Sequence, residues 1–192
     1  MNLYLRLLRV LIKSWLETDT HYSEPVESTF RVWPHDLDAF GHMNNGRYLQ
    51  IMDVARTHWM SRAGVIAAIR KNRWAPILGG GFIRYRYSLR LWQPYRVRSR
   101  LLCWDDQWFF LEHVFIDVKN RHVAVGISRA ALRTKGRWVA TQKVAQAVNP
   151  GAVSPDVPAY VMEWLGLEEE MFRRGGEFRH DPSDTALYQE AT

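Results

Sequence analysis

The stretch HDLDAFGHMNNGRYLQIMDVAR, residues 35–56, places acidic and amide side chains directly ahead of a helical pattern. The first turn of a helix has amide N–H groups without partners and a partial positive charge, so it stabilises an oxyanion that develops on a carbonyl. Asn44 or Asn45 can cap this helix. Asp38, ahead of both, can reach the same space as a general base or nucleophile.

Two further residues of this loop bear on its chemistry. His42 could orient the Asp38 carboxylate or share a proton with it, and Gly41 gives the backbone freedom before the helix. Ordinary turns and caps use the same residue types, however. The pattern therefore leaves two interpretations open, a reaction centre and a plain capped helix entry.

The elements that would position these residues follow an α+β order. A strand is expected at 26–33 and a helix at 46–64, which is apolar over most of its circumference. From Gly81 onward the apolar period changes to two, and further strands are expected at 82–92, 95–104, 107–118 and 122–134. The sequence therefore predicts an α+β domain in which an antiparallel sheet wraps around one long central helix.

The length and composition fit one globular domain with an arm at each end. The chain has 192 residues, of which 47% are hydrophobic, and this excludes a disordered chain. We expect an amphipathic arm at 1–24, the main domain at 25–148, and a C-terminal helix with a polar tail at 149–192.

Charge and cysteine usage limit the partners and the compartment. The net charge of +6 and the pI of about 9.7 favour an anionic partner, which could be a phosphate-bearing ligand, a membrane surface or nucleic acid. The single cysteine, Cys103, cannot form an internal disulfide, so a reducing, cytoplasmic compartment is expected. No Cys/His cluster has zinc-ligand spacing, and neither a metal nor a cofactor is expected.

The N-terminal stretch MNLYLRLLRVLIKSWLE has the pattern of an amphipathic helix. It does not fit a signal peptide, because Arg6, Arg9 and Lys13 interrupt its apolar run, and it is too short and too charged to span a bilayer. The three cations are predicted to share one face, with leucines, Ile12 and Trp15 around the rest. Two alternatives remain open: residues 1–16 lie in a membrane interface, or they pack on the domain or a partner subunit.

The stretch DLDAFGHMNNGRYLQIMDVAR resembles the signature of the 4-hydroxybenzoyl-CoA thioesterase-like branch of the hot-dog thioesterases. The thioesterase superfamily member 6-like group is most similar, because it shares the core HMNN-x-RYL, and plant acyl-carrier-protein thioesterases carry a related motif. The order of one strand, one helix and four strands extends the resemblance to roughly residues 26–140. It implies a hot-dog fold that hydrolyses acyl-CoA or a related acyl thioester without a metal, as a homodimer or homotetramer.

The resemblance also implies roles for individual residues. Asp38 matches the carboxylate that attacks the thioester or activates water, and Asn45 matches the position whose amide polarises the thioester carbonyl. His42 matches a histidine of the catalytic network in the plant enzymes. Phe40 stands where those enzymes have an asparagine, which shifts the expectation toward Asp38 acting with the helix amides.

Substrate contacts are expected around this loop and on the basic strands. The candidates are Gly41, Asn44, Gly46, Tyr48, Arg84 and Arg86. Tyr48 falls on the motif tyrosine, for which packing is the main expectation. Arg84, Arg86 and Arg90 alternate along one expected strand, and Arg96, Arg98 and Arg100 along the next. Some of these arginines could meet the phosphates of CoA across a subunit boundary, and the alternative is a solvated strand face.

Other possibilities are weaker or stay open. Asp53 stands where another hot-dog branch has its catalytic acid, but an i,i+3 pair with Arg56 is the simpler expectation. No nucleic-acid recognition motif accompanies the arginines, so no nucleic-acid partner is expected. A non-catalytic acyl-thioester binder at a membrane surface is the alternative function. Trp59, Phe82, Trp104 and Phe109 would suit an apolar acyl group, whose length the sequence does not give.

Overall fold

The computed structural model describes residues 3–177 of the chain. Two compact units make up the fold, Met1–Ser154 and Pro155–Thr192. The first unit contains the sheet and the helices that pack on it. The second contains a single described helix, α5 (Ala159–Glu177), which lies in the segment 149–192 where a C-terminal helix was expected. The expected polar tail lies outside the described residues from 178 onward.

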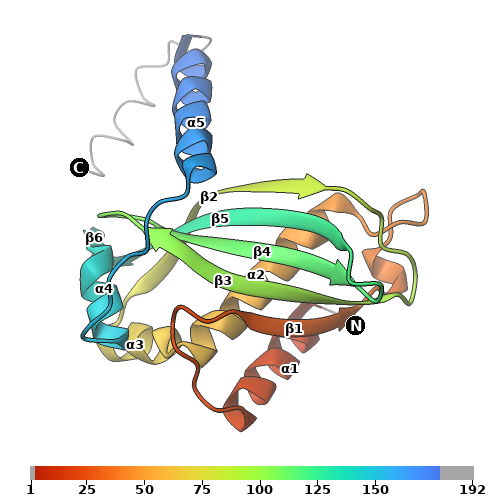
Figure 1. Cartoon of the computed structure of the whole chain (residues 1–192), viewed down its shortest axis with the longest axis horizontal. Helices are drawn as coiled ribbons and strands as arrows, with labels where there is room; N and C mark the ends of the chain where they lie inside the picture. The colour runs from red at the N-terminus through yellow and green to blue at the C-terminus, as the bar shows by residue number, and fades with distance from the viewer. Residues whose placement is uncertain (1–2, 178–192) are drawn as a thin grey trace. The chain divides into compact units, whose positions relative to one another are not determined.

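One antiparallel sheet dominates the first unit (Figure 1). Its strands lie in the order β1-β3-β4-β5-β2, and the short β6 pairs with β5. Their bounds are β1 (Val26–Arg31), β2 (Ala75–Tyr85), β3 (Pro94–Trp104), β4 (Phe109–Asp117), β5 (His122–Thr134) and β6 (Arg137–Val139). The long helix α2 (Asn45–Arg62) crosses one face of this sheet. The predicted α+β architecture, an antiparallel sheet around one central helix, is confirmed.

Helix α2 lies close to the predicted range of 46–64. It begins after Asn44, whose side chain accepts a hydrogen bond from the Gly46 N–H at 2.8 Å, and it ends before Gly64, which has a positive φ of 75°. Its buried side chains are Tyr48, Ile51, Met52, Val54, Ala55, His58 and Trp59. They recur at helical spacing, so one broad side of α2 fills the core against the sheet.

The strand expected at 82–92 is wrong in its bounds. β2 begins at Ala75 and ends at Tyr85, and the N–H groups of Arg86 and Tyr87 both donate to the carbonyl of Val123. The chain then turns, with Trp92 at a positive φ of 60°. The apolar alternation continued past the real strand end, while the Gly79–Gly81 run hid the real start because glycine lowers the strand signal.

Two short helices flank the far end of α2 and were not predicted. They are α3 (Val65–Asn72) and α4 (Thr141–Val148). Their apolar residues Ala68 and Val144 join Trp74, Leu132 and Val139 in one buried cluster. Together they close the end of the sheet that lies opposite the start of α2.

Helix α1 (Leu3–Leu16) packs on α2. Its buried residues, Arg6, Val10 and Ser14, recur every fourth residue and form the inner face. The prediction that Arg6, Arg9 and Lys13 share one face does not hold for Arg6, because Arg6 forms a buried ion pair with Asp36 while Arg9 and Lys13 are exposed. Among residues 3–177, no helix combines the length and the hydropathy that a bilayer span needs.

Candidate functional site

The acidic loop ahead of α2 folds back on itself as a small hairpin. Leu37 and Met43 form an antiparallel bridge, and the Asp38 N–H donates to the His42 carbonyl at 2.8 Å. One step further out, the Asn44 N–H donates to the Asp36 carbonyl at 2.8 Å. The Asp36–Asn44 pair lies directly before α2, which begins at Asn45. Asp38 is two residues beyond Asp36 in the hairpin, or roughly 7 Å along an extended chain from this pair.

The Asp38 carboxylate is held by amides of its own loop. Its Oδ1 accepts hydrogen bonds from the N–H groups of Phe40 at 2.9 Å and His42 at 3.1 Å. Gly41 completes the tight turn at a positive φ of 76°, which favours glycine. Oδ2 accepts no hydrogen bond from the described residues, and the side chain is half-buried. The carboxylate therefore has a fixed orientation and one oxygen that can bind a water.

The start of α2 offers exposed hydrogen-bond donors. Asn44 caps the helix, and Asn45 and Gly46 are exposed like it. Within the described part of the chain, no group accepts a hydrogen bond from the Asn45 N–H, while its carbonyl accepts one from the Tyr85 hydroxyl at 3.1 Å. A carbonyl oxygen of a ligand would meet this amide and the positive end of the helix dipole.

The other two loop candidates have different surroundings. His42 contacts Asp38 through its backbone and forms a bridge with Arg90, so the structure shows no hydrogen bond between the imidazole and the carboxylate. Tyr48 is 2% exposed and lies with its ring 5.1 Å from that of Tyr85. Burial raises the pKa of Tyr48 to about 12. Its position fits the expected packing role.

The candidate arginines fall into two groups. Arg84 on β2 and Arg86 just beyond it are exposed, and Arg86 lies over the Tyr87 ring. On β3, in contrast, Arg96 pairs with Glu27 and Arg100 pairs with Glu112. The pairs on β3 match the alternative of a solvated strand face.

Asp53 forms the ion pair expected for it. Its Oδ1 accepts a hydrogen bond from Arg56 at 2.5 Å, one turn further along α2. The Asp53 side chain is 55% exposed, whereas that of Arg56 is 14% exposed.

A cavity of about 250 Å³ lies between the second half of α2 and the sheet. Sequence reasoning did not locate it. Arg56 is the one charged residue in a wall that otherwise is apolar, apart from the phenol of Tyr22. The wall includes Trp59 and Met60 of α2, Pro76, Ile77 and Leu78 of β2, Leu101 and Trp104 of β3, Phe109 and Leu111 of β4, Ala130, Ala131 and Leu132 of β5, and residues of α3 and α4. Three of the four expected aromatic residues thus line it, and Phe82 does not.

The cavity and the acidic loop lie at opposite ends of α2. Asn45 begins the helix, and the cavity residues Arg56 and Trp59 come 11 and 14 residues later, which corresponds to about 16–21 Å along the axis. One copy of the chain therefore does not bring Asp38 to its own cavity.

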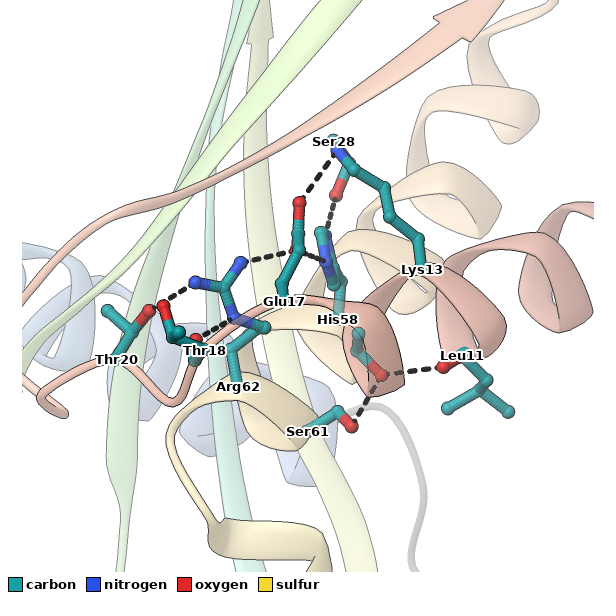
Figure 2. A network of polar contacts seen from close by, with 10 residues as sticks. Leu11, Lys13, Glu17, Thr18, Thr20, Ser28, His58, Ser61 and Arg62 are labelled. Atoms are coloured by element: carbon teal, nitrogen blue, oxygen red, sulfur yellow. Dashed lines mark hydrogen bonds and ion pairs between the residues drawn. The ribbon is translucent and has the colours of Figure 1, made fainter.

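A buried polar network near the end of α1 was also missed (Figure 2). The His58 ring bonds to the Ser28 hydroxyl at 2.8 Å through Nδ1 and to the Glu17 carboxylate at 3.2 Å through Nε2, and Arg62 pairs with the same carboxylate. Burial lowers the pKa of His58, and Glu17 acts in the opposite direction. Ser28 is 2% exposed and His58 is fully buried, so no substrate can reach this serine. The network connects residues 17–20 to α2 and β1 through hydrogen bonds and an ion pair.

A second buried histidine, His113, lies across the inner sheet face. It bonds to Ser99 of β3 at 2.9 Å and to Ser128 of β5 at 3.1 Å. Burial, and after it the charge of Arg56, lower the pKa of His113 to about 3. It is therefore a neutral link between three strands. Within residues 3–177, no three His, Cys, Asp or Glu side chains are grouped so as to bind a metal ion.

The chain is similar in sequence to a known protein family and to its members. Residues 32–165 match the family described as the Thioesterase-like superfamily. Over 137 residues the chain is 39% identical to Protein THEM6 of Xenopus laevis, which covers 70% of this chain and 64% of that protein. The chain thus spans less than two thirds of that relative's length.

Solved structures share the fold. YbaW, a probable thioesterase from Escherichia coli, superposes with a TM-score of 0.59 at 19% identity, over 64% of this chain and 94% of YbaW. A gentisyl-coenzyme A thioesterase superposes with a TM-score of 0.52 at 23% identity, over 56% of this chain and 88% of that enzyme.

Proposed function

Because the chain belongs to the Thioesterase-like superfamily, as its motif predicted, we propose that it hydrolyses acyl-CoA or a related acyl thioester to the free acid and the thiol. The observation that carries this proposal is the hairpin closure between Asp36 and Asn44. It holds an oriented carboxylate, that of Asp38, beside the open first turn of a helix. A carboxylate, a water and an oxyanion donor suffice for hydrolysis of an activated ester.

The proposed mechanism assigns one step to each group. Oδ2 of Asp38 takes a proton from a water, whose oxygen attacks the thioester carbonyl carbon. The carbonyl oxygen becomes an oxyanion, and the Asn45 N–H with the helix dipole stabilises it. The C–S bond then breaks, the thiolate takes the proton from Asp38, and the acid leaves. In the nucleophilic alternative Asp38 attacks the carbonyl directly, and water hydrolyses the resulting anhydride.

We propose that two copies of the chain assemble the site. The outer edge of β2 pairs with no described strand, and its apolar side chains Leu78 and Phe82 are 52% and 49% exposed. A long, exposed, apolar edge is a template for pairing with a second copy. A twofold axis near Gly80 would make that pairing antiparallel and would continue the sheet.

This pairing would join the two halves of the site. The C-terminal end of β2 lies next to the acidic loop, because Tyr85 bonds to Asn45, and the N-terminal end lines the cavity through Pro76, Ile77 and Leu78. In an antiparallel pair the Tyr85 end of one copy lies beside the Ala75 end of the other. The loop of one copy therefore faces the cavity of its partner. A homotetramer would add a second such dimer.

The substrate class follows from the cavity and the exposed cations. A wall that is apolar except for Arg56 and the phenol of Tyr22 suits an aliphatic or aromatic acyl group. Arg84 and Arg86 are exposed near the loop end of β2 and can bind the phosphates of CoA or of a carrier-protein arm. In this proposal the carrier remains outside the cavity.

The decisive experiment measures thiol release from acyl-CoA and acyl-carrier-protein substrates of increasing chain length, with aromatic acyl groups included. Asp38→Asn should lower the turnover rate by ~10² to 10⁴. Its amide oxygen can still accept from Phe40 and His42, so the loop should stay folded. The matched control is Asp53→Asn, which should retain turnover. Parental turnover by Asp38→Asn would contradict the proposal, and loss of turnover in Asp53→Asn alone would move the catalytic role to Asp53.

A non-catalytic acyl-thioester binder is the competing function. Phe40, which is 85% exposed at the tip of the loop, supports it, because it stands where the plant enzymes have a polar residue. The same assay separates the two. Saturable binding of an acyl-CoA without thiol release would establish the binder.

A further inference from the structure

The outward face of α1 carries a continuous apolar stripe. Six large side chains on this helix are 46% to 83% exposed: Tyr4, Leu5, Leu8, Ile12, Trp15 and Leu16. At 100° per residue they fall within an arc of about 120°. A soluble surface rarely leaves so many neighbouring apolar groups uncovered without a binding role.

The opposite face of α1 is fixed to the domain. Arg6 forms its buried ion pair with Asp36, and the Ser14 hydroxyl bonds to Ser61 of α2 at 2.8 Å. Just after the helix, Glu17 holds Arg62 and His58 (Figure 2). These contacts hold α1 at both ends, so the helix cannot rotate to bury its apolar stripe. Within the first unit, the stripe therefore faces away from α2.

Cations border the stripe on one side. Arg9 is exposed, four residues after Leu5 and three before Ile12, so it neighbours both on the helix surface. Lys13 follows one turn later, where it pairs with Glu17 at 3.3 Å. Among the described residues Arg9 has no ion-pair partner. The chain as a whole carries a net charge of +6.

We propose that this face of α1 binds an anionic membrane surface. The helix lies in the plane of the interface, with Leu8 and Ile12 among the acyl chains, Tyr4 and Trp15 at the headgroup level, and Arg9 on the lipid phosphates. Tyrosine and tryptophan favour this boundary because they combine an apolar ring with a polar tip. The proposal does not depend on the hydrolysis proposed above.

Charge argues against a second copy as the occupant. A twofold contact between two such stripes would bring Arg9 and Lys13 of one copy close to the same residues of the other. Each copy also carries a net charge of +6. Like charges oppose that contact, whereas an anionic surface attracts them.

The test measures sedimentation of the full chain with vesicles of phosphatidylcholine that contain about one third phosphatidylglycerol, against vesicles of phosphatidylcholine alone. The expected result is binding to the anionic vesicles that weakens as salt rises. Leu8→Asp with Ile12→Asp should lower binding about tenfold or more, since charges enter the apolar boundary. Val118→Asp is the matched control, because Val118 is 65% exposed in the turn between β4 and β5. Its binding should equal that of the parent.

Charge reversal tests the second part of the proposal. Arg9→Glu should lower binding about fivefold or more, whereas Arg70→Glu, the same change on the exposed side of α3, should have little effect. If Leu8→Asp with Ile12→Asp fails to fold, Trp15→Ser with Leu16→Ser, at the most exposed end of the stripe, replaces it.

Three results would overturn the proposal. They are no binding to anionic vesicles, equal binding by the α1 variants and the parent, and a parent oligomer that dissociates when the stripe is charged while no vesicle binding occurs. The last result would assign the stripe to contact between copies.

Discussion

Arg6 of α1 and Asp36 of the acidic loop form an ion pair with side chains that are 2% and 0% exposed. Asp36 is the first residue of the stretch DLDAFGHMNNGRYLQIMDVAR, and its carbonyl accepts the hydrogen bond from Asn44 that closes the hairpin. Its carboxylate also accepts the Trp33 N–H at 2.9 Å. The N-terminal helix is therefore connected directly to the loop that carries Asp38, two residues further on.

Removing one partner of this pair should destabilise the protein strongly. Arg6→Met removes the buried cation that pairs with the Asp36 carboxylate and leaves the longer ion pair with Arg47 at 3.7 Å, so we expect a loss of about 3 kcal/mol in the free energy of unfolding. Arg6→Met with Asp36→Asn should recover part of this loss, because no uncompensated charge remains. Urea denaturation of the two single variants and the double variant gives the coupling energy. Independent, additive losses would show that the two side chains do not act as a pair.

Stability should depend on pH through the buried histidines. Burial lowers the pKa of His113 to about 3 and lowers that of His58. In the unfolded chain both rings take up protons near their ordinary pKa of about 6.5, while the folded rings take them up only at lower pH. The stabilising contribution of His113 is therefore complete above pH 6.5 and is lost as the pH falls through the window from about 6.5 to 3, with a slope of up to ~1.4 kcal/mol per pH unit. The contribution of His58 is lost in the same direction, as the pH falls below about 6.5.

His113→Gln tests this dependence. Glutamine can bond to one or both of Ser99 and Ser128 but does not titrate, so the variant should lose stability less steeply between pH 6 and 5. Ordinary carboxylates have pKa values below this interval, so they contribute little to the slope measured there. Urea denaturation at several pH values checks the slope, which does not depend on the absolute stability of the variant. Equal slopes for the variant and the parent would mean that His113 already takes up a proton in the folded state.

A site shared between two copies predicts complementation in mixed dimers. Asp38→Asn keeps an intact cavity but lacks the base, whereas Ala131→Trp fills the cavity and keeps Asp38. Each should be nearly inactive alone. Copies mixed under exchange conditions form hybrid dimers, in which one of the two sites combines the intact cavity with the intact loop. About a quarter of the parental turnover should return.

The control mixes each variant with itself under the same conditions and should recover nothing. Mixtures of the two variants that exchange subunits, as shown by size or mass, and yet stay inactive would place the loop and the cavity of one copy in the same site.

Phe82→Lys on the edge of β2 should shift the parent toward the monomer, because it places a charge where the second strand would pair.

The local motif was readable from the sequence, whereas the parts that depend on distant contacts were not. The start of α2 after Asn44 followed from cap chemistry and periodicity, which act within a few residues. The burial of Arg6 depends on Asp36, thirty residues away in the chain, and a lone arginine in an amphipathic pattern favours the surface. The start of β2 at Ala75 was hidden because its glycines and Pro76 lower the strand signal.

The cavity could not be predicted from the sequence, because it too depends on contacts between residues that are distant in the chain. Its wall combines side chains from α2, α3, α4 and four strands, and their inward positions depend on strand register. Trp59, Trp104 and Phe109 were expected at the acyl group from their aromatic character alone, and the same criterion also selected Phe82. That residue is 49% exposed on the edge strand. Which aromatic residues face the helix is decided by pairing partners, since a shift of one residue exchanges the two faces.

Gly79 should be intolerant of a side chain because Trp108 covers it. A Cβ at this position would lie 2.2 Å from the Trp108 ring, and the ring is held between Trp138 at 5.4 Å and the Arg129 guanidinium at 4.9 Å. The backbone N–H of Trp108 also donates a hydrogen bond to the Asp105 carboxylate at 2.6 Å. Because the ring cannot move aside freely, Gly79→Ala should cost about 1–3 kcal/mol in the free energy of unfolding.

Two comparisons make this prediction specific. Gly81→Ala on the same strand is the matched control, since its Cβ would lie 3.4 Å from the Ile127 carbonyl, an ordinary contact, and should change stability little. In a Trp108→Ala background the obstacle is gone, so Gly79→Ala should become neutral or stabilising by up to about 1 kcal/mol, as expected for alanine replacing glycine in a strand. Urea denaturation of the single and double variants measures both effects. An equal cost of Gly79→Ala with and without the Trp108 ring would show that the backbone at the β2 bulge, and not the indole, requires glycine there.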